Sequence, residues 1–204
     1  MSRFIEAAND IAHRGWAVIS DFLPPVTIAT LRAEAEQFWQ QSDFRKAGTG
    51  RLGGYAIRPD VRSDHIHWLD EQSLTEAQSL YRAAIEELRQ DLNHELFLSL
   101  STYESHFAVY PAGAFYQKHL DRFSNSDERT ISCTFYLNEN WKEEFGGQLR
   151  LYLPGSFVDV LPTAGTCVLF RSDSFFHEVL PATEIRFSLT GWFRRRSLRL
   201  VQSP

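Results

Sequence analysis

Apolar residues recur at helical spacing through the first hundred residues of the chain. The spacing from Phe4 to Ala12 predicts a helix that ends near Gly15, and residues 16–22 then have the pattern of a strand. A second helix is expected to open at Pro24-Pro25. The longest helical signal covers residues 74–97, where nine apolar positions form one face. Those positions are Leu74, Ala77, Leu80, Tyr81, Ala84, Ile85, Leu88, Leu92 and Leu96.

The pattern changes after Leu100, where short apolar runs separated by Gly, Pro, Asn and Asp replace the helical periodicity. The expected strands cover residues 103–110, 130–137, 148–153, 157–161, 166–171 and 186–193. Helices followed by strands favour an α+β fold with a mainly β core, a sandwich of antiparallel sheets buttressed by the N-terminal helices. The double-stranded β-helix, or jelly roll, fits this order best.

A chain of 204 residues with 43% hydrophobic content is expected to form one domain. We expect residues 1–100 to supply the helical support and a lid loop, residues 101–194 the jelly-roll core, and residues 195–204 a basic tail. Four glycines and several charges interrupt the pattern between Phe44 and Asp60. This stretch is either a simple connector or part of a lid that extends to residue 64.

The net charge of −5 and the sequence pI near 5.8 disfavour nucleic acid as a partner. Arg194 to Arg196 and Arg199 then indicate a solvated tail. No apolar run approaches the roughly 18 residues that span a bilayer. With no signal-peptide core at the N-terminus, we expect a cytoplasmic protein without a membrane partner. Cys133 and Cys167 lie in apolar runs and are expected to be reduced core thiols.

Candidate chemistry centres on His119, Asp121 and His177. In an extended segment, residues two apart point to the same side, so His119 and Asp121 can converge on one ion. Two imidazoles and a carboxylate on one side of an octahedron are typical of non-haem Fe(II) oxygenases. A His-x-Asp pair alone is weak evidence, and an isolated histidine is more often structural.

Arg186 strengthens the metal interpretation, because it follows His177 by nine residues in an apolar run. Its planar guanidinium matches a carboxylate, so an inward-facing arginine one strand from the metal can hold the far end of a dicarboxylate. The natural candidate is 2-oxoglutarate, whose keto-acid end would occupy two of the remaining iron positions and leave one for O2.

A wider set of motifs resembles the 2-oxoglutarate oxygenases of the hypoxia-inducible-factor prolyl hydroxylase type, particularly their short bacterial forms. The resemblance covers about residues 16–194. It is carried by Arg62-Ser-Asp64 with Trp68, Tyr110-Pro111, Tyr116, His119-x-Asp121, Arg129, Tyr136-Leu-Asn138, Trp141, Gly146-Gly147, His177-Glu-Val179 and Arg186 through Trp192.

The resemblance implies a role for each further candidate residue. Binding of 2-oxoglutarate would involve Arg186, Tyr136, Tyr110, Thr134 and Trp192. Contact with substrate or lid would involve Arg62, Asp64, Tyr116 and Arg129. Aromatic packing explains Tyr110, Tyr116 and Trp192 equally well, and a solvated surface is an alternative for the charged residues. His106 and Thr134 depart from the family, since the animal enzymes carry apolar side chains there.

The implied function is a dioxygenase that uses Fe(II), 2-oxoglutarate and O2, with ascorbate as a candidate reductant, and produces succinate and CO2. Its substrate would be a protein or peptide bearing a proline, hydroxylated at C4, and elongation factor Tu is the candidate. Two alternatives stay open. The same chemistry could act on a free amino acid, a small metabolite or an alkylated base, or the jelly roll could be a non-catalytic sensor.

Overall fold

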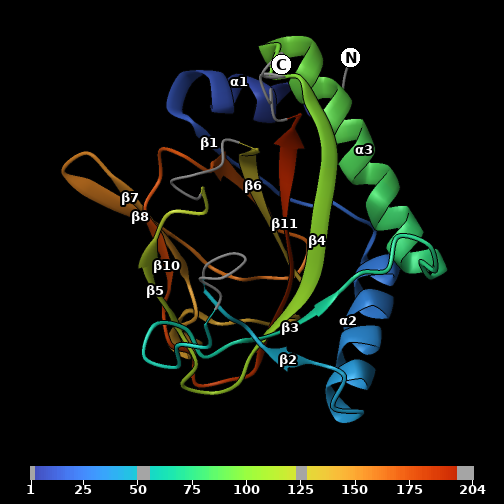
Figure 1. Ribbon diagram of the computed structural model, residues 1–204, viewed down its shortest axis with the longest axis vertical. Helices are drawn as coiled ribbons and strands as arrows, with labels where there is room; N and C mark the ends of the chain where they lie inside the picture. Colours follow the sequence, from blue (N-terminus) through green and yellow to red (C-terminus); the bar gives the residue numbers. More distant parts are fainter. Residues whose placement is uncertain (1–2, 50–55, 123–127, 197–204) are drawn as a thin grey trace, which may run out of the picture.

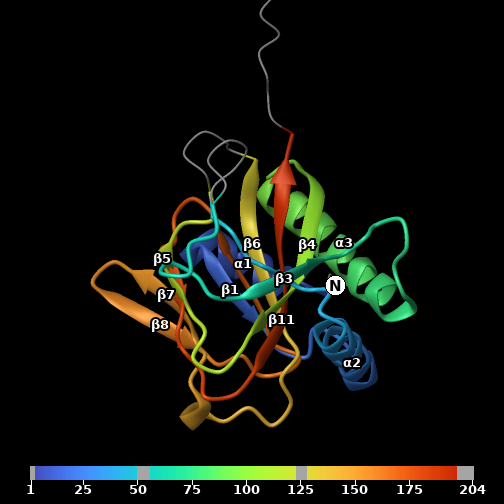
Figure 2. The same ribbon diagram turned by 60° about the horizontal axis from the view of Figure 1, so that its bottom comes forward.

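The computed structural model of the chain describes residues 3–49, 56–122 and 128–196. Three helices, α1 (Ile5–Arg14), α2 (Pro25–Gln40) and α3 (Glu76–Leu96), cover one side of a large sheet, and a smaller sheet lies across the other side (Figures 1 and 2). The molecule therefore has a layer of helices, a large sheet and a small sheet.

The helices begin and end where local chemistry requires it. The Thr75 side chain accepts a hydrogen bond from the Gln78 backbone N–H and caps the first turn of α3. Helix α1 ends at Gly15, whose φ of 81° lies in the left-handed region that glycine adopts readily. A Cβ at this position would also lie 2.7 Å from the Phe175 ring, so the turn into the sheet requires glycine.

The large sheet has seven strands in the order β1-β9-β6-β11-β4-β3-β2. The small sheet has four strands in the order β5-β10-β7-β8, and neighbouring strands in both sheets pair antiparallel. The bounds are β1 (Trp16–Ile19), β2 (Arg45–Lys46), β3 (His65–Trp68), β4 (Leu100–Tyr110), β5 (Tyr116–His119), β6 (Arg129–Tyr136), β7 (Leu149–Leu153), β8 (Ser156–Val160), β9 (Cys167–Arg171), β10 (His177–Val179) and β11 (Arg186–Arg195), with a 3-10 turn η2 (Glu143–Phe145). The predicted α+β fold with a double-stranded β-helix is confirmed.

Every strand predicted after Leu100 is present, and four short strands were not predicted. One of them, β2, pairs with β3 and so belongs to the sheet, although its residues lie in the stretch expected to be a connector or a lid. Strand β11 also runs to Arg195, two residues beyond its predicted end. The part of the predicted lid at residues 50–55 lies outside the described residues.

The two faces of the large sheet bury different sets of side chains. The helix face packs against Leu31, Tyr81 and Leu88, and it includes Cys133 and Cys167 as buried free thiols. The opposite face packs against the small sheet through residues such as Tyr136 and Leu151. No helix in the described ranges is long and apolar enough to cross a membrane.

Candidate metal centre and cofactor pocket

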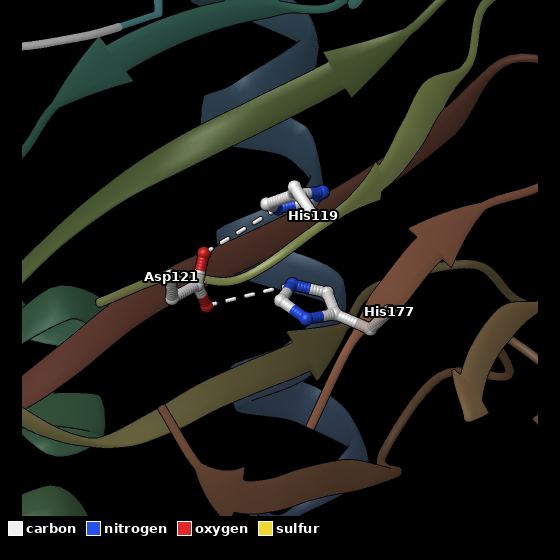
Figure 3. A group of neighbouring side chains, drawn as sticks. All are labelled: His119, Asp121 and His177. Atoms are coloured by element: carbon white, nitrogen blue, oxygen red, sulfur yellow. Dashed lines mark ion pairs between the residues drawn. The ribbon is translucent and has the colours of Figure 1, made fainter. Parts of the chain in front are cut away.

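Strand pairing in the small sheet brings the two candidate histidines together. His119 at the end of β5 lies directly opposite His177 at the start of β10, and the ring centroids are 4.1 Å apart. Asp121 follows β5 by two residues and turns toward both rings (Figure 3). A single antiparallel pairing thus brings together two histidines that are fifty-eight positions apart in the sequence.

The three side chains present one donor atom each to a common point. Asp121 Oδ1 lies 3.5 Å from His119 Nε2, and Asp121 Oδ2 lies 3.5 Å from His177 Nε2. The candidate ligand atoms all lie within 4.8 Å of one another. This donor set, two imidazole nitrogens and one carboxylate, suits a ferrous ion and leaves the remaining coordination positions open.

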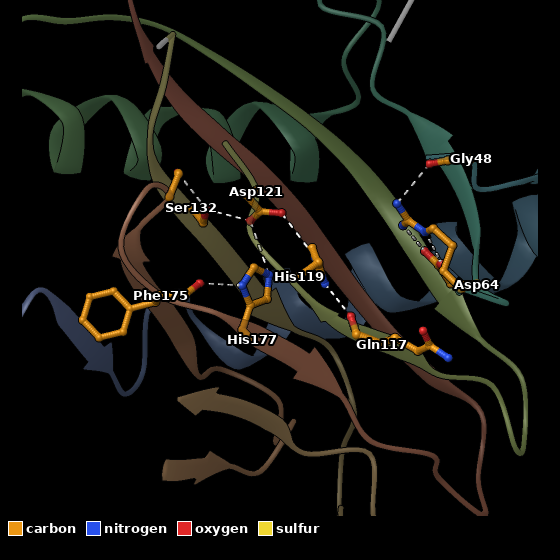
Figure 4. A network of polar contacts seen from close by, with 10 residues as sticks. Gly48, Asp64, Gln117, His119, Asp121, Ser132, Phe175 and His177 are labelled. Carbon is orange, nitrogen blue, oxygen red and sulfur yellow. Dashed lines mark hydrogen bonds and ion pairs between the residues drawn. The ribbon is translucent and has the colours of Figure 1, made fainter. Parts of the chain in front are cut away.

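Backbone carbonyls orient both imidazoles. His119 Nδ1 lies 2.7 Å from the Gln117 carbonyl oxygen, and His177 Nδ1 lies 3.1 Å from that of Phe175 (Figure 4). A proton on each Nδ1 would donate to these carbonyls, so each Nε2 keeps a free lone pair for a metal. The histidines are therefore arranged as ligands rather than as structural core residues.

Electrostatics gives the triad the protonation states that metal binding needs. Burial lowers the pKa of His177 to about 4, against the opposing pull of the Asp121 charge. Burial alone would raise the pKa of Asp121, but His177, His119 and the Ser132 hydroxyl together hold it well below its usual range. At neutral pH the site offers a neutral imidazole and an ionised carboxylate, as metal ligation requires.

Ser132 on β6 orients the Asp121 carboxylate. Its hydroxyl donates to Asp121 Oδ2 at 2.7 Å and lies 2.9 Å from the Ser172 hydroxyl (Figure 4). Sequence reasoning missed this residue. Its signal is a polar residue in phase with Thr134 and Tyr136 within an otherwise apolar strand, because alternate residues of a strand share one face.

A cavity of about 440 Å³ opens beside the triad, between the two sheets. Its lining includes Arg62, Asp64, Tyr110, Tyr116, His119, Asp121, Arg129, Thr134, His177, Arg186 and Trp192, which are eleven of the twelve site residues expected from the sequence. The twelfth, Tyr136, is fully buried behind this lining and contacts Arg186. The structure thus brings all twelve expected residues to one region.

Arg186 and Tyr136 lie together at one buried place in the cavity region, where the arginine charge has no acidic partner among the described residues. The Arg186 side chain is 2% exposed, and its guanidinium carbon lies 4.9 Å from the ring centroids of both Tyr110 and Tyr136. Its Nε donates to the Gly147 carbonyl at 3.0 Å. No acidic side chain of the described ranges pairs with Arg186, so a bound carboxylate would compensate its buried charge.

Tyr136 adds an unpaired donor beside that guanidinium. Its hydroxyl is buried and makes no hydrogen bond of ordinary geometry in the described part of the chain. Burial raises its pKa to about 12, while the neighbouring Arg186 guanidinium opposes this rise. Buried polar groups nearly always have partners, so an unpaired one next to an unpaired cation indicates a ligand. A carboxylate fits both groups, as the distal end of 2-oxoglutarate does.

Gly147 is what allows the arginine to pack here. Its φ is 71°, and a Cβ would approach Arg186 Cδ to 3.3 Å and the Ala182 Cβ to 3.0 Å. Steric contacts therefore explain why the second residue of the Gly146-Gly147 motif is glycine.

A solvated surface was the alternative expected for Arg62 and Asp64, and it is wrong, because both side chains are packed. Arg62 Nη2 lies 2.6 Å from Asp64 Oδ2, its Nε lies 2.7 Å from Oδ1, and Asp64 is 1% exposed. The Arg62 guanidinium also lies 4.1 Å from the Tyr116 ring centroid. The three residues form one packed unit at the side of the cavity.

Arg129 is similarly engaged. It forms an ion pair with Glu104 at 2.9 Å, and its guanidinium carbon lies 3.4 Å from the Trp192 ring centroid. Arg194 also pairs with Glu104, at 3.2 Å, so Arg194 is held by the network rather than solvated as part of a basic tail. Sequence reasoning missed Glu104, which is in phase with His106 and Tyr110 on β4 and lines the cavity.

A double-stranded β-helix that carries a His–Asp–His triad and a buried, uncompensated arginine in one cavity defines the class of non-haem iron oxygenases that use 2-oxoglutarate. Comparison with known proteins agrees. The family model of the 2OG-Fe(II) oxygenase superfamily matches residues 105–194. A crystal structure of a prolyl-4-hydroxylase from Pseudomonas putida is similar at 43% identity with a TM-score of 0.86, over 94% of this chain and 98% of that one.

Two further relatives indicate the prolyl hydroxylase type within this class. A prolyl hydroxylase of Trichoplax adhaerens, solved with a hypoxia-inducible-factor peptide fragment, shares 27% identity with a TM-score of 0.86, over 100% of this chain and 94% of that one. The hypoxia-inducible factor prolyl hydroxylase of Caenorhabditis elegans is 31% identical over 91% of this chain, which spans 27% of that protein's length. The chain belongs to the 2OG-Fe(II) oxygenase superfamily, and within it to the prolyl hydroxylase type, whose cofactors are Fe(II), 2-oxoglutarate and O2.

Proposed function

We propose that this chain is a 2-oxoglutarate-dependent prolyl 4-hydroxylase that acts on a protein. The observation that carries the proposal is the pairing, in one cavity, of a preorganised His–Asp–His triad with a buried arginine that has no acidic partner among the described residues. One part of the cavity suits a ferrous ion, and the other suits the carboxylate of a diacid.

Each residue then has a defined task. His119, Asp121 and His177 would hold Fe(II), while Arg186 and the Tyr136 hydroxyl would hold the distal carboxylate of 2-oxoglutarate. When bound, these cofactors supply the oxidising chemistry: one atom of O2 enters the substrate C–H bond as a hydroxyl group, and the other enters succinate as CO2 leaves. Ser132 keeps Asp121 oriented and ionised throughout.

The cavity walls would exclude water and position the cofactor. Tyr110 and Trp192 are buried aromatic side chains in the lining, and Thr134 lines the same cavity. These apolar surfaces lie beside the charged and polar side chains of the lining, which can fix the orientation of a ligand. We propose that Tyr110 contacts 2-oxoglutarate near Arg186, and that Thr134 and Trp192 border the cofactor toward its metal-binding end.

A protein substrate would reach the cavity between two charged units. Arg62 with Asp64 packs on Tyr116, and Arg129 with Glu104 packs on Trp192, so aromatic faces backed by ion pairs flank the entrance. Such faces suit a proline ring and the peptide around it. The peptide bound to the Trichoplax adhaerens relative supports the same class of substrate. The described parts of residues 44–64 would border this entrance as a lid, since Gly48 and Thr49 lie in the cavity lining.

Elongation factor Tu is the candidate substrate that the sequence resemblance implies. The test is to incubate the purified chain with Fe(II), 2-oxoglutarate, ascorbate and purified elongation factor Tu, and to search the digested substrate by mass spectrometry. The expected result is the mass gain of one oxygen atom on a proline, with an equal amount of succinate. The Asp121→Ala variant is the negative control.

The outcome also separates the alternatives. Oxygen gain on a proline of another protein, found when cell lysate replaces elongation factor Tu, would keep the activity and reject this substrate. Succinate formation stimulated by a lysate filtrate, without any protein modification, would indicate a small-molecule substrate. Absence of succinate with every substrate would favour a non-catalytic sensor.

We also propose a cytoplasmic location. Cys133 and Cys167 are free thiols with sulfur atoms 3.5 Å apart, a pair suited to reducing conditions. A reducing compartment also helps to keep iron ferrous. Cell fractionation with an antibody against the chain tests this assignment, and recovery in an oxidising compartment would contradict it.

A further inference from the structure

The cavity floor contains a row of polar side chains with no role in holding iron or the distal carboxylate. His106 on β4, Thr190 on β11 and Thr134 on β6 are direct partners across three neighbouring strands. All three line the cavity. Polar side chains that converge on a pocket usually mark where a ligand is oriented.

Two atoms in this region are buried without hydrogen bonds. His106 is 3% exposed and packs against two indole rings, with its centroid 4.8 Å from that of Trp68 and 5.5 Å from that of Trp192. His106 Nδ1 and Trp192 Nε1 are both buried, and neither finds a partner within the described residues. Burying such groups unpaired costs stability, so native proteins retain them where something else supplies the partner.

The chemistry of the two groups restricts that partner. The indole N–H can only donate, and a neutral imidazole donates from one nitrogen. Burial, together with the charges of Arg62 and Arg129, lowers the pKa of His106 to about 3, so the ring is neutral at physiological pH. Those same guanidinium groups disfavour a cationic ligand group. Because Arg62 and Arg129 already pair with Asp64 and Glu104, no excess positive charge favours an anion, and an uncharged oxygen atom that accepts hydrogen bonds satisfies these conditions.

The position of the pair separates it from the carboxylate site. Trp192 lies six residues beyond Arg186 on β11, about 20 Å along an extended strand. It is instead the cross-strand partner of Glu104 and of Ser132, whose hydroxyl holds Asp121. The unpaired atoms therefore lie near the metal triad, toward the Glu104–Arg129 side where a substrate would enter.

We propose that His106 and Trp192 form a hydrogen-bonding subsite for one uncharged oxygen of the substrate, a peptide carbonyl oxygen next to the target proline. The assignment rests on the proposed function, since it presumes a peptide substrate. It makes His106 a specificity-determining residue, because an apolar side chain at this position would leave the carbonyl oxygen without one of its two donors.

The first test is the thermal stability of the ligand-free protein. His106→Leu removes an unpaired polar ring, so its Tm should rise by about 2–4 °C, the shift that relief of one such group gives in a chain of this size. Trp68→Phe, which alters the other indole next to His106, should not raise the Tm. A lower Tm for His106→Leu would show that its ring is already paired, and would overturn the proposal.

The second test observes the donor directly. The chain has five tryptophans, so the ¹⁵N-labelled protein with Zn(II) in place of iron gives few indole N–H signals, and loss of a signal in Trp192→Phe assigns Trp192. Titration with N-acetyl-L-proline N-methylamide, a small diamide, should move the Trp192 signal downfield. If this signal does not move at any concentration of the diamide, the subsite does not exist.

The third test uses turnover and separates this proposal from the proposed function. With elongation factor Tu as substrate, His106→Leu and Trp192→Phe should each raise the apparent KM for the protein about tenfold, the effect of one lost hydrogen bond. His106→Asn, which places an amide near the Nδ1 position, should recover part of the loss, while the Kd of 2-oxoglutarate with His106→Leu stays unchanged. An unaltered KM in both variants overturns the subsite, whereas absence of succinate from the wild type rejects the proposed function; the first two tests need no turnover.

Discussion

The two faces of the large sheet each bury a pair of tyrosines, and the pairs differ in one respect. On the helix face, the Tyr81 and Tyr103 hydroxyls lie 2.7 Å apart and satisfy each other. On the cavity face, Tyr110 and Tyr136 both pack on the Arg186 guanidinium, and the Tyr136 hydroxyl is unpaired. The hydroxyl groups of the first pair satisfy each other within the hydrophobic core. The second pair leaves the Tyr136 hydroxyl available to a ligand.

This difference is energetic as well as geometric. A satisfied buried pair contributes to folding, while an unpaired donor or an uncompensated charge lowers stability until a ligand arrives. Substitutions on the helix face should therefore change stability more than cofactor binding. Substitutions on the cavity face should change cofactor binding more than stability.

The largest effect is expected at the metal triad. Asp121→Ala removes the charged ligand and leaves two neutral imidazoles, so substrate-coupled succinate production should be abolished while the fold remains intact. His119→Ala should have the same effect. Succinate assays and circular dichroism of the same preparations check both statements. Wild-type-like turnover in either variant would refute the ligand assignment.

Ser132→Ala is the matched control at this site. It keeps all three ligands and removes only the hydroxyl that donates to Asp121. Metal affinity should fall by about 10- to 100-fold, the usual effect of losing such an outer hydrogen bond. Isothermal titration with Mn(II) measures the change.

Replacement of Arg186 should produce the next largest effect. Arg186→Gln removes the charge that faces the distal carboxylate, so the Kd of 2-oxoglutarate should rise more than about 100-fold, in line with the loss of a charge-assisted, bidentate contact. The unfolding free energy of the ligand-free protein should not fall, because a buried charge without an acidic partner has been removed. Binding is measured with Mn(II) present, and stability by urea unfolding. A marked loss of stability with unchanged binding would place Arg186 in the core.

Two phenylalanine substitutions compare the tyrosine pairs directly. Tyr136→Phe should weaken 2-oxoglutarate binding by about 10-fold, since a hydrogen bond to a charged group is lost, with little change in unfolding free energy. Tyr103→Phe leaves the Tyr81 hydroxyl unpaired in the core, so it should cost about 1–3 kcal/mol of stability without changing binding. Equal effects of the two substitutions on both measurements would remove the distinction between the faces.

The sequence predicted the long helices and strands and the charged residues of the site, but it did not predict four of the short strands. Helix α3 and strands β4, β6 and β11 have enough residues for a periodic signal. Strands β2, β3, β5 and β10 have two to four residues, and only their pairing partners define them. The strand β5 was nevertheless implied by chemistry, because His119 needs an extended segment to share a metal with Asp121.

Site residues were predicted from the sequence where the residue type itself has a specific chemistry. They were missed where only the neighbouring residues give the side chain its role. His119, His177 and Arg186 carry their roles in their side chains and spacing. Ser132 and Glu104 acquire roles only from their neighbours, Asp121 and Arg129. Burial of the Arg62–Asp64 pair could not be read from the sequence, because the same residues form surface ion pairs elsewhere.

The smallest effect is expected from the pH dependence of stability on the cavity face. Burial is the main reason that the pKa of His106 falls to about 3, whereas the unfolded chain has the ordinary value near 6.5. The unfolded state therefore binds the extra proton as the pH falls below about 6.5, and His106 costs stability between there and about pH 3. His106→Leu removes this cost, so the variant should gain about 1.4 kcal/mol over wild type when the pH is lowered from 7.5 to 5.5. The other histidines titrate in both proteins and cancel in the difference, which urea unfolding at the two pH values measures. A difference independent of pH would mean that His106 is not buried as a neutral ring, and the contrast between the two faces would then rest on Tyr136 and Arg186 alone.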